Sequence, residues 1–231
     1  MTRHHGELIY AGGDDVLLFL PTDEAIACAA AIRDKFREAM EAESWSKGTG
    51  PSLSGGIAVV HYKEDLRFAL AQVRDAEKKA KRIDRKGTKK AKDALALTIC
   101  KRSGEHATVV MGWDQTPLLQ KLVSDFKGTK VERTGEKHPP ASDRWTYKLR
   151  TEVPTLTALP LAAGRAETLR LVRRVENAPP KFDERIGELF KSYQAEIGYA
   201  DDPDLAKPDA DVLTGFVLLC QSASFLARGK E

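Results

Sequence analysis

The stretch GELIYAGGDDVLLFLP, residues 6–21, decides how the rest of the sequence is interpreted. Two β-rich runs, residues 7–11 and 15–20, flank a Gly-Gly-Asp turn, and this arrangement predicts a β-hairpin. The tip of the hairpin carries two adjacent carboxylates, Asp14 and Asp15. Like charges placed this close repel each other, and a bound divalent cation removes the repulsion.

Oxygen ligands of this kind suit Mg²⁺ or Mn²⁺. Gly12 and Gly13 precede the two acids, and because glycine lacks Cβ and tolerates positive φ, a triphosphate can approach the backbone there. Two metal ions held by such carboxylates activate a 3′-hydroxyl and stabilise a leaving pyrophosphate. The alternative is a type I′ turn with no chemistry, and the hairpin alone leaves both interpretations open.

Strand-like and helix-like patterns alternate after the hairpin, as far as a polar segment at residues 128–141 that contains Gly135 and two prolines. The expected elements are a helix over residues 22–40, a strand over 54–62, a helix over 65–80, strands over 94–101 and 107–113, and a helix over 116–126. Beyond the polar segment the pattern is helical throughout, over residues 142–153, 161–177, 182–197 and 210–227. We therefore expect an α+β domain at residues 1–128 and an all-α bundle at 129–231.

Composition excludes several classes of protein. The 231 residues are 42% hydrophobic and 31% charged, which is typical of a folded globular chain. No apolar run approaches the ~20 residues that span a bilayer, and the first residues lack the pattern of a signal peptide, so we expect a cytoplasmic protein without a membrane partner. Cys28, Cys100 and Cys220 lie far apart without a zinc-binding spacing, which favours reduced core cysteines.

The net charge of +3 hides an uneven distribution. A basic ridge over residues 78–92 contains a single acid, Asp84, and its density suits phosphate or nucleic acid. On charge alone, a solvated helix end followed by a loop is an equally good interpretation. The basic residues are Lys78, Lys79, Lys81, Arg82, Arg85, Lys86, Lys89, Lys90 and Lys92.

Four segments together carry a family resemblance. They are HHGELIYAGGDDVLLFLP at residues 4–21, SLSGGIAVVHYKEDLRFALAQVRDAEKKAK at 52–81, DALALTICKRSGEHATVVMGW at 93–113 and GFVLLCQSASFLARG at 215–229. In this order and spacing the chain resembles the large polymerase/cyclase subunit of type III CRISPR effector complexes, particularly the III-B branch. The similar part of that subunit is its second palm domain with the small-subunit-like helical domain that follows.

The resemblance implies a fold and an activity. The family's palm is ferredoxin-like, is related to the GGDEF domains of diguanylate cyclases, and converts ATP into cyclic oligoadenylate second messengers for antiviral defence when the complex binds target RNA. Transferred by position, Asp14 and Asp15 are the catalytic metal ligands for Mg²⁺ or Mn²⁺, and six other residues bind the nucleotide. These six are Gly12, Gly13, Ser54, Gly55, Gly56 and Lys81. For Lys81 a solvated surface charge is the alternative.

The partners implied are the other effector subunits, guide RNA and target RNA. The C-terminal helices resemble the bundle that lies along the RNA-bearing backbone of the complex, and basic residues there are candidates for phosphate contacts. An ordinary exposed helical face explains each of them equally well. The candidates are Arg144, Lys148, Arg150, Arg165, Arg170, Arg173 and Arg174.

The chain also departs from the family pattern. A complete palm has a strand and a helix ahead of its hairpin, so we expect a palm that is incomplete at its N-terminus: a split subunit, a truncation or a fragment, with the other palm half as a further partner. The strand at residues 54–62 is then expected to have an unpaired edge. Two alternatives remain: a structural RNA-complex-binding subunit with an inactive palm remnant, and a diguanylate cyclase, against which Val16 stands where those enzymes carry Phe.

Overall fold

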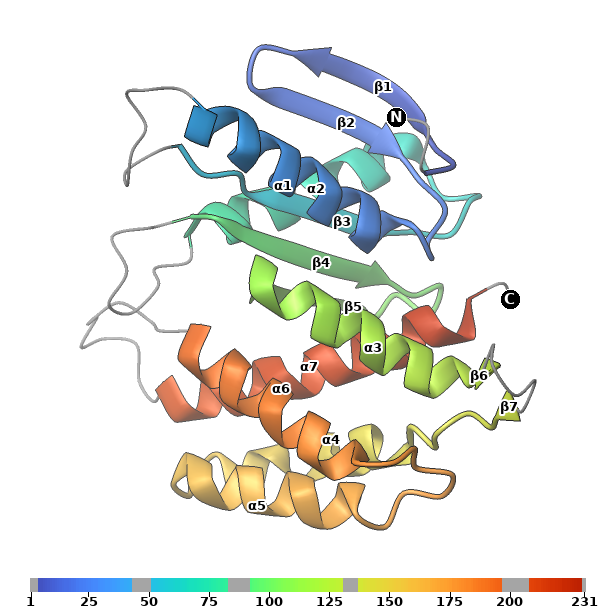
Figure 1. Ribbon diagram of the computed structural model, residues 1–231, viewed down its shortest axis with the longest axis vertical. Coiled ribbons are helices and arrows are strands. Elements are labelled where there is room, and N and C mark those ends of the chain that lie inside the picture. Colours follow the sequence, from blue (N-terminus) through green and yellow to red (C-terminus); the bar gives the residue numbers. More distant parts are fainter. Residues whose placement is uncertain (1–3, 43–50, 83–91, 131–136, 197–207, 230–231) are drawn as a thin grey trace. The chain divides into compact units, whose positions relative to one another are not determined.

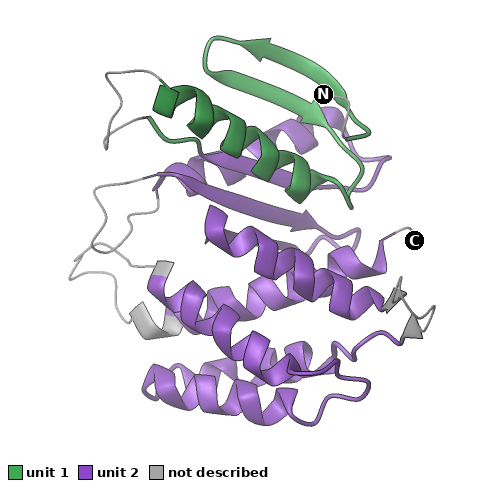
Figure 2. Cartoon of the chain, in the orientation of Figure 1, with its two compact units in different colours: residues 1–53 green, residues 54–231 purple. Residues whose placement is uncertain are grey.

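The computed structural model divides the chain into two compact units, residues 1–53 and residues 54–231 (Figure 2). It describes residues 4–42, 51–82, 92–130, 137–196 and 208–229. Each unit is described by itself below. The α+β region followed by helices that the sequence predicted is confirmed, with elements in the order ββαβαββα before the helical part.

Unit 1 is the predicted hairpin followed by one helix (Figure 1). Strands β1 (Glu7–Gly12) and β2 (Asp15–Phe19) pair antiparallel, with an irregularity in register between Leu8 and Tyr10. Helix α1 (Ala25–Ala42) follows. The Glu24 carboxylate accepts a 2.7 Å hydrogen bond from the backbone N–H of His5, which ties the residues before β1 to the start of α1.

The sheet of unit 2 has three strands in the order β3-β4-β5. Strand β3 (Gly55–Val59) runs parallel to β4 (Ala94–Cys100), joined to it through helix α2 (Leu66–Arg82), and β5 (His106–Gly112) lies antiparallel to β4. Every residue of β4 is buried, as expected for a strand covered on both faces. Among the described residues β3 is an edge strand of this sheet, as the sequence predicted.

Small side chains let α2 approach one face of the sheet closely. Ala76 and Ala80 of α2 form a buried cluster with Ala94 and Ala96 of β4, all at 0% exposure. Gly56 lies directly opposite Ala96 in the parallel register. A Cβ at Gly56 would lie 2.5 Å from the backbone nitrogen of Glu77 and 2.6 Å from the backbone oxygen of Val73. The helix backbone therefore occupies the space where any other residue would place its side chain.

The opposite face of the sheet is covered by helices centred on α7 (Pro208–Arg228), which contacts β5 and four other helices. Its Phe216 is fully buried, with the Phe190 ring 4.6 Å away. Of the described helices, none has the length and apolar character to cross a membrane. The remaining elements are the 3-10 turn Trp113–Gln115, α3 (Thr116–Lys127), α4 (Arg144–Leu156), α5 (Leu161–Val172) and α6 (Phe182–Glu196).

Two predicted helix ends are wrong. Helix α4 continues through Pro154 to Leu156, rather than ending at residue 153. A proline in the last turn removes only one backbone donor. The last turn still closes because the Thr157 N–H donates to the Val153 oxygen at 2.9 Å. Helix α5 ends at Val172 rather than at Asn177. There the chain tightens into i→i+3 bonds, such as Val175 N–H to the Val172 oxygen at 3.0 Å.

The segment expected to separate two domains contains two short strands, β6 (Thr129–Lys130) and β7 (Lys137–His138), which pair with each other. Contacts join the elements on its two sides. The Ala141 N–H donates to the Asp125 backbone oxygen at 2.9 Å, and Arg185 of α6 pairs with the Asp125 carboxylate of α3 at 2.6 Å. The boundary at residues 128/129 stays a prediction about folding units.

The turn between β4 and β5 is fastened to the helices through Glu105. Its carboxylate pairs with Lys101 at 2.8 Å and with Arg150 of α4 at 2.7 Å. Hydrogen bonds from Lys101 and Arg150 lower the pKa of Glu105 to about 2. The link spans 45 positions of sequence and attaches the sheet to the helical part of unit 2.

A pH dependence follows from this pKa. An acid whose folded-state pKa is depressed contributes stability that is present above its unfolded pKa, ~4.5, and is lost as the pH falls toward 2. Because the Glu105 side chain is 38% exposed, solvent screening reduces the effect to about 1 kcal/mol. We expect Glu105→Gln to lower the free energy of unfolding by that amount at pH 6, and the difference from wild type to vanish near pH 2. Urea titrations of both proteins across this range measure it, and a difference independent of pH contradicts the assignment.

Candidate active site

The tip of the β1–β2 hairpin is a two-residue turn in which Gly12 pairs with Asp15, and Gly13 and Asp14 make the connection. Gly13 has a φ of +61°, whereas Asp14 is not among the residues with positive φ. Positive φ at the first central position alone is the pattern of a type II′ turn. The type I′ turn considered from the sequence is therefore wrong, although a tight hairpin turn is confirmed.

Glycine is required at positions 12 and 13 for different structural reasons. Gly13 takes the left-handed conformation, and a Cβ there would meet nothing within 4 Å. Gly12 does not take positive φ, so that expectation is wrong for it. A Cβ at Gly12 would lie 2.5 Å from the hydroxyl of Tyr10, so its small size makes room for that ring. The open backbone at Gly13 agrees with close approach of a phosphate.

Asp14 and Asp15 are both exposed at this tip. Within the described ranges, no three His, Cys, Asp or Glu side chains come together as a metal site. A complete protein cage is not needed for Mg²⁺, which proteins usually hold through one or two carboxylates, the rest of its ligands being substrate phosphates and water. The two aspartates therefore fit a divalent ion that arrives with a nucleotide.

Ser54, Gly55 and Gly56 lie in unit 2, at the start of β3. Both glycines are explained by packing: Gly56 meets the α2 backbone, and a Cβ at Gly55 would lie 3.1 Å from the Trp113 ring. Sequence reasoning missed the role of Trp113, and no pattern around it indicates the contact. The Ser54 hydroxyl is buried and has no hydrogen-bond partner among the described residues. Of the three residues, Ser54 is therefore the one with a side-chain polar group that a ligand could use.

Lys81 lies in the last turn of α2 and pairs with Glu77 one turn earlier. The neighbouring Lys79 pairs likewise with Asp75 at 2.8 Å. Helix α2 thus neutralises part of the basic ridge itself. The ridge residues Arg85, Lys86, Lys89 and Lys90 lie outside the described residues. Binding of a phosphate by Lys81 stays a prediction, and it would require the ammonium to be shared with Glu77 or released from it.

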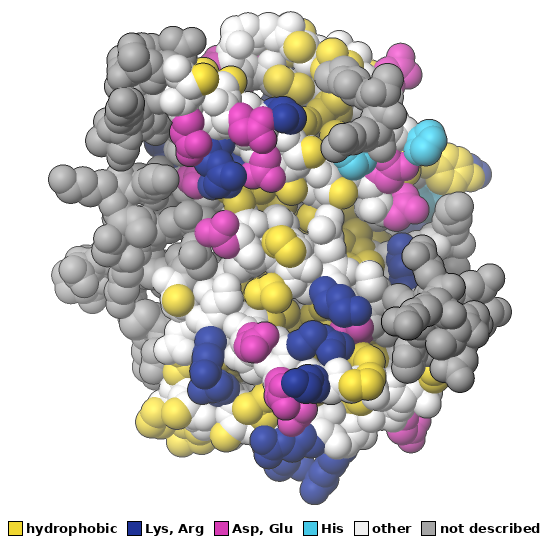
Figure 3. All heavy atoms as spheres, in the orientation of Figure 1, with side chains coloured by type: hydrophobic (Ala, Val, Ile, Leu, Met, Phe, Trp, Pro, Cys, Tyr) yellow, Lys and Arg dark blue, Asp and Glu magenta, His cyan; other side chains and the backbone are white. Residues whose placement is uncertain are grey.

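Several of the basic candidates on the C-terminal helices are also paired. Arg150 pairs with Glu105, Arg170 with Glu167, and Arg173 with Asp183 at 3.2 Å. Figure 3 shows Lys and Arg side chains over the helical part of unit 2 with acidic side chains among them. Paired cations attract phosphate less than unpaired ones do. The better candidates are therefore those that form no ion pair with a described residue: Arg144, Lys148, Arg165 and Arg174.

The predicted site residues fall into two sets. Gly12, Gly13, Asp14 and Asp15 belong to unit 1, whereas Ser54, Gly55, Gly56 and Lys81 belong to unit 2. The structure establishes the local geometry of each set, and the pocket that would join them stays a prediction.

The β1–β2 hairpin and the β3–α2–β4 arrangement, followed by helices, are the elements of a palm-like α+β fold. The family described as Cas10/Cmr2, second palm domain, matches residues 1–96. That part of the chain is therefore similar to a second palm domain of the Cas10/Cmr2 family.

Comparison with a curated relative agrees. The chain is a homologue of the CRISPR system Cmr subunit Cmr2 of Pyrococcus furiosus, with 42% identity over 135 residues. The aligned region covers 55% of this chain and 15% of the relative. The chain therefore matches a small part of that protein's length.

Proposed function

We propose that this chain is the palm-bearing part of a type III CRISPR effector subunit, and that its hairpin converts ATP into cyclic oligoadenylates when the assembled complex binds target RNA. The observation that carries the proposal is the exposed pair Asp14 and Asp15 at a turn whose preceding residue, Gly13, has positive φ and open space around it. This pair lies inside the segment that matches the Cas10/Cmr2 palm.

The chemistry assigned to each group follows from its position. Asp14 and Asp15 hold Mg²⁺ or Mn²⁺, and the bound ions supply charge neutralisation at the phosphates and Lewis-acid activation of the attacking 3′-hydroxyl. The Gly13 backbone lets the triphosphate come close to the turn. Gly12, Ser54, Gly55, Gly56 and Lys81 complete the proposed nucleotide site.

Partners and location are part of the same proposal. The other Cmr subunits, guide RNA and target RNA surround the palm in the assembled complex, which works in the cytoplasm.

Metal binding tests the site separately from the assembled activity. We expect Mn²⁺ with a non-hydrolysable ATP analogue to bind the full chain, and the Asp14→Asn/Asp15→Asn double variant to bind the ion at least about tenfold more weakly, because a neutral amide is a far poorer ligand for a hard cation. Electron paramagnetic resonance of free Mn²⁺ measures the difference. Glu7→Gln, which removes an exposed acid from the far end of the same hairpin, is the matched control. Equal Mn²⁺ binding by all three proteins contradicts the proposed metal site.

Base choice is a separate expectation. The family implies adenine, so we expect the assembled complex to consume ATP and to leave GTP. Chromatography with mass spectrometry of the products from an equimolar mixture decides it. Cyclic di-guanylate without oligoadenylate would favour the diguanylate cyclase alternative.

The second candidate is a structural subunit with an inactive palm. The observation in its favour is that Asp14 and Asp15 have no third acidic, histidine or cysteine neighbour within the described part of the chain. Under this candidate the chain contributes RNA and subunit contacts only. Mn²⁺ binding that depends on the two aspartates, without any nucleotide product from the complex, is its signature.

A further inference from the structure

The turn that connects β3 to α2 is held by its own hydrogen bonds. The Glu64 N–H donates to the His61 backbone oxygen at 2.9 Å, and the Lys63 N–H donates to His61 Nδ1 at 3.2 Å. The Asp65 carboxylate accepts from the Arg67 N–H at 2.6 Å, at the start of α2. These bonds hold the backbone on both sides of Tyr62 in place.

Of the large hydrophobic side chains that the structure describes, Tyr62 is the most exposed, at 83%. The His61 ring lies 4.6 Å from it between centroids, tilted by 33°, and the Lys63 Nζ lies 5.5 Å from its centroid. An aromatic side chain of this size normally buries much of its area. Here the ring is supported by a second ring and a cation while most of its surface remains open to solvent.

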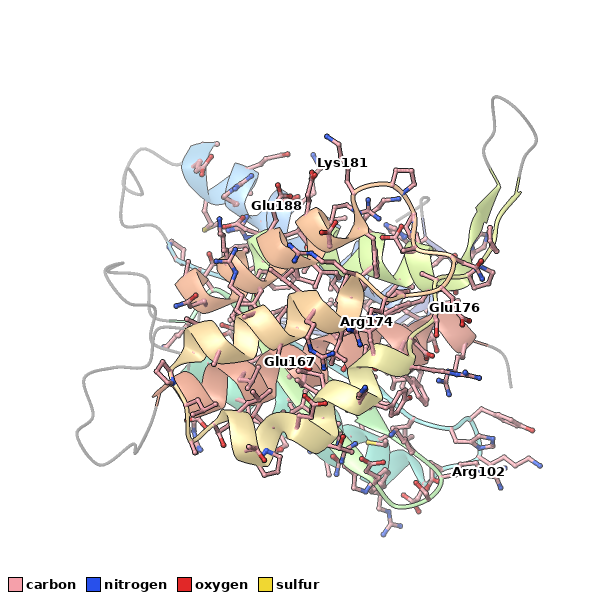
Figure 4. The ribbon with its side chains drawn as sticks, turned by 90° about the horizontal axis from the view of Figure 1, so that it is seen from below. Arg102, Glu167, Arg174, Glu176, Lys181 and Glu188 are labelled. Atoms are coloured by element: carbon pink, nitrogen blue, oxygen red, sulfur yellow. The ribbon has the colours of Figure 1, made fainter. Side chains whose placement is uncertain are left out.

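Basic groups from the β4–β5 turn lie at the same end of the sheet. Strands β3 and β4 are parallel, so the segments that follow them leave the sheet at one edge. Two observations place the β3–α2 connection near the β4–β5 turn. The pKa of the Cys100 thiol is raised mainly by burial and also by the charge of Glu64. The Phe68 ring lies 5.5 Å from the His106 ring. Figure 4 shows Arg102 away from Glu167 and Arg174.

The cations at this edge are less neutralised than those of the helices. Arg67 and Arg102 are exposed and form no ion pair with any described residue, and Lys63 is engaged with the Tyr62 ring rather than with a carboxylate. Glu105 is shared between Lys101 and Arg150. The Asp65 carboxylate accepts a hydrogen bond from the Arg67 N–H at the start of α2. Glu64 is a further exposed acid of the same turn.

We propose that Tyr62, with His61, Lys63 and Arg102, is a stacking platform for an unpaired base of single-stranded nucleic acid. A π-face stacks on any base, and neighbouring cations attract the phosphates on either side of it. A surface for a protein partner has an apolar centre with a charged rim, whereas the neighbours of this ring are charged and Leu66 is the exposed aliphatic side chain beside it. The platform lies in unit 2 and is independent of the catalytic role proposed for Asp14 and Asp15.

Binding of a fluorescein-labelled 12-nucleotide RNA without secondary structure to the full chain tests the platform, by fluorescence anisotropy at 50 mM salt. Tyr62→Ala is expected to weaken binding about 5- to 100-fold, the range for loss of one stacked base, and Tyr62→Phe to retain it. Arg102→Gln is expected to lower the slope of log affinity against log salt by about one. Leu66→Ala removes an exposed side chain without a π-face and is the matched control, expected to bind like wild type.

Cross-linking with 5-iodouridine RNA gives an independent measurement, because a stacked aromatic ring is the side chain that couples to this base. The adduct is expected in the tryptic peptide that contains Tyr62. Equal affinity of Tyr62→Ala and wild type, or an equal loss in Leu66→Ala, overturns the proposal. Unchanged RNA affinity combined with loss of a subunit contact in Tyr62→Ala also overturns it and makes the turn a protein contact. Failure of the Mn²⁺ test leaves these readouts unaffected.

Discussion

Replacing Gly56 with alanine is expected to destabilise the protein by about 3 kcal/mol or more. The added methyl group would lie 2.5 Å from the Glu77 nitrogen and 2.6 Å from the Val73 oxygen, and both of these are backbone atoms of α2. A backbone cannot rotate out of the way as a side chain does, so α2 must move off the sheet and open the alanine cluster beneath it. Overpacking in a core typically costs about 1–3 kcal/mol, and more where the neighbours cannot move.

Thermal unfolding followed by circular dichroism measures this effect, with an expected fall in Tm of roughly 6–12 °C for a domain of this size. Gly187→Ala is the matched control. A Cβ at Gly187, inside α6, would meet only the Leu169 Cδ2 at an ordinary 3.5 Å. Alanine is the better helix former, so this variant is expected to be unchanged or more stable by about 0.5–1 kcal/mol. Equal Tm values for the two variants would show that β3 and α2 are not packed as described.

The local patterns of the sequence predicted the β-rich and helical elements well. Alternation and turn residues indicated the β1–β2 and β4–β5 hairpins, and apolar periodicity indicated α1, α2 and α3. These features depend on neighbours a few residues apart. The palm assignment rests on the same stretch, since the residues that form the hairpin also lie within the family match at residues 1–96.

Contacts between distant segments could not be predicted in the same way. Gly56 was interpreted as a nucleotide-binding residue, and only the position of α2 reveals that the helix backbone requires a glycine there. The Arg150–Glu105 pair joins residues 45 positions apart. The phosphate-binding candidates on the C-terminal helices were chosen by charge, and the sequence shows how many cations those helices carry. It does not show that Arg170 and Arg173 already have acidic partners.

The second large effect is expected at the hairpin tip. Replacing both Asp14 and Asp15 with alanine removes both carboxylates from the proposed metal site, and no other described acid, histidine or cysteine clusters there to replace them. Loss of one group that stabilises transition-state charge typically lowers rates by about 10²–10³-fold. Loss of both is therefore expected to lower cyclic oligoadenylate formation at least about 100-fold. Because both side chains are exposed, folding and RNA binding should be unaffected.

The most direct test of the account is the rate at which the assembled complex, with target RNA bound, converts radiolabelled ATP into cyclic product in wild type and in the Asp14→Ala/Asp15→Ala variant. Glu7→Ala, on the same hairpin, serves as the control for assembly. The account predicts product from wild type and from Glu7→Ala, none above background from the double variant, and equal target-RNA binding by all three. Undiminished synthesis by the double variant would contradict the assignment of the hairpin as the catalytic site.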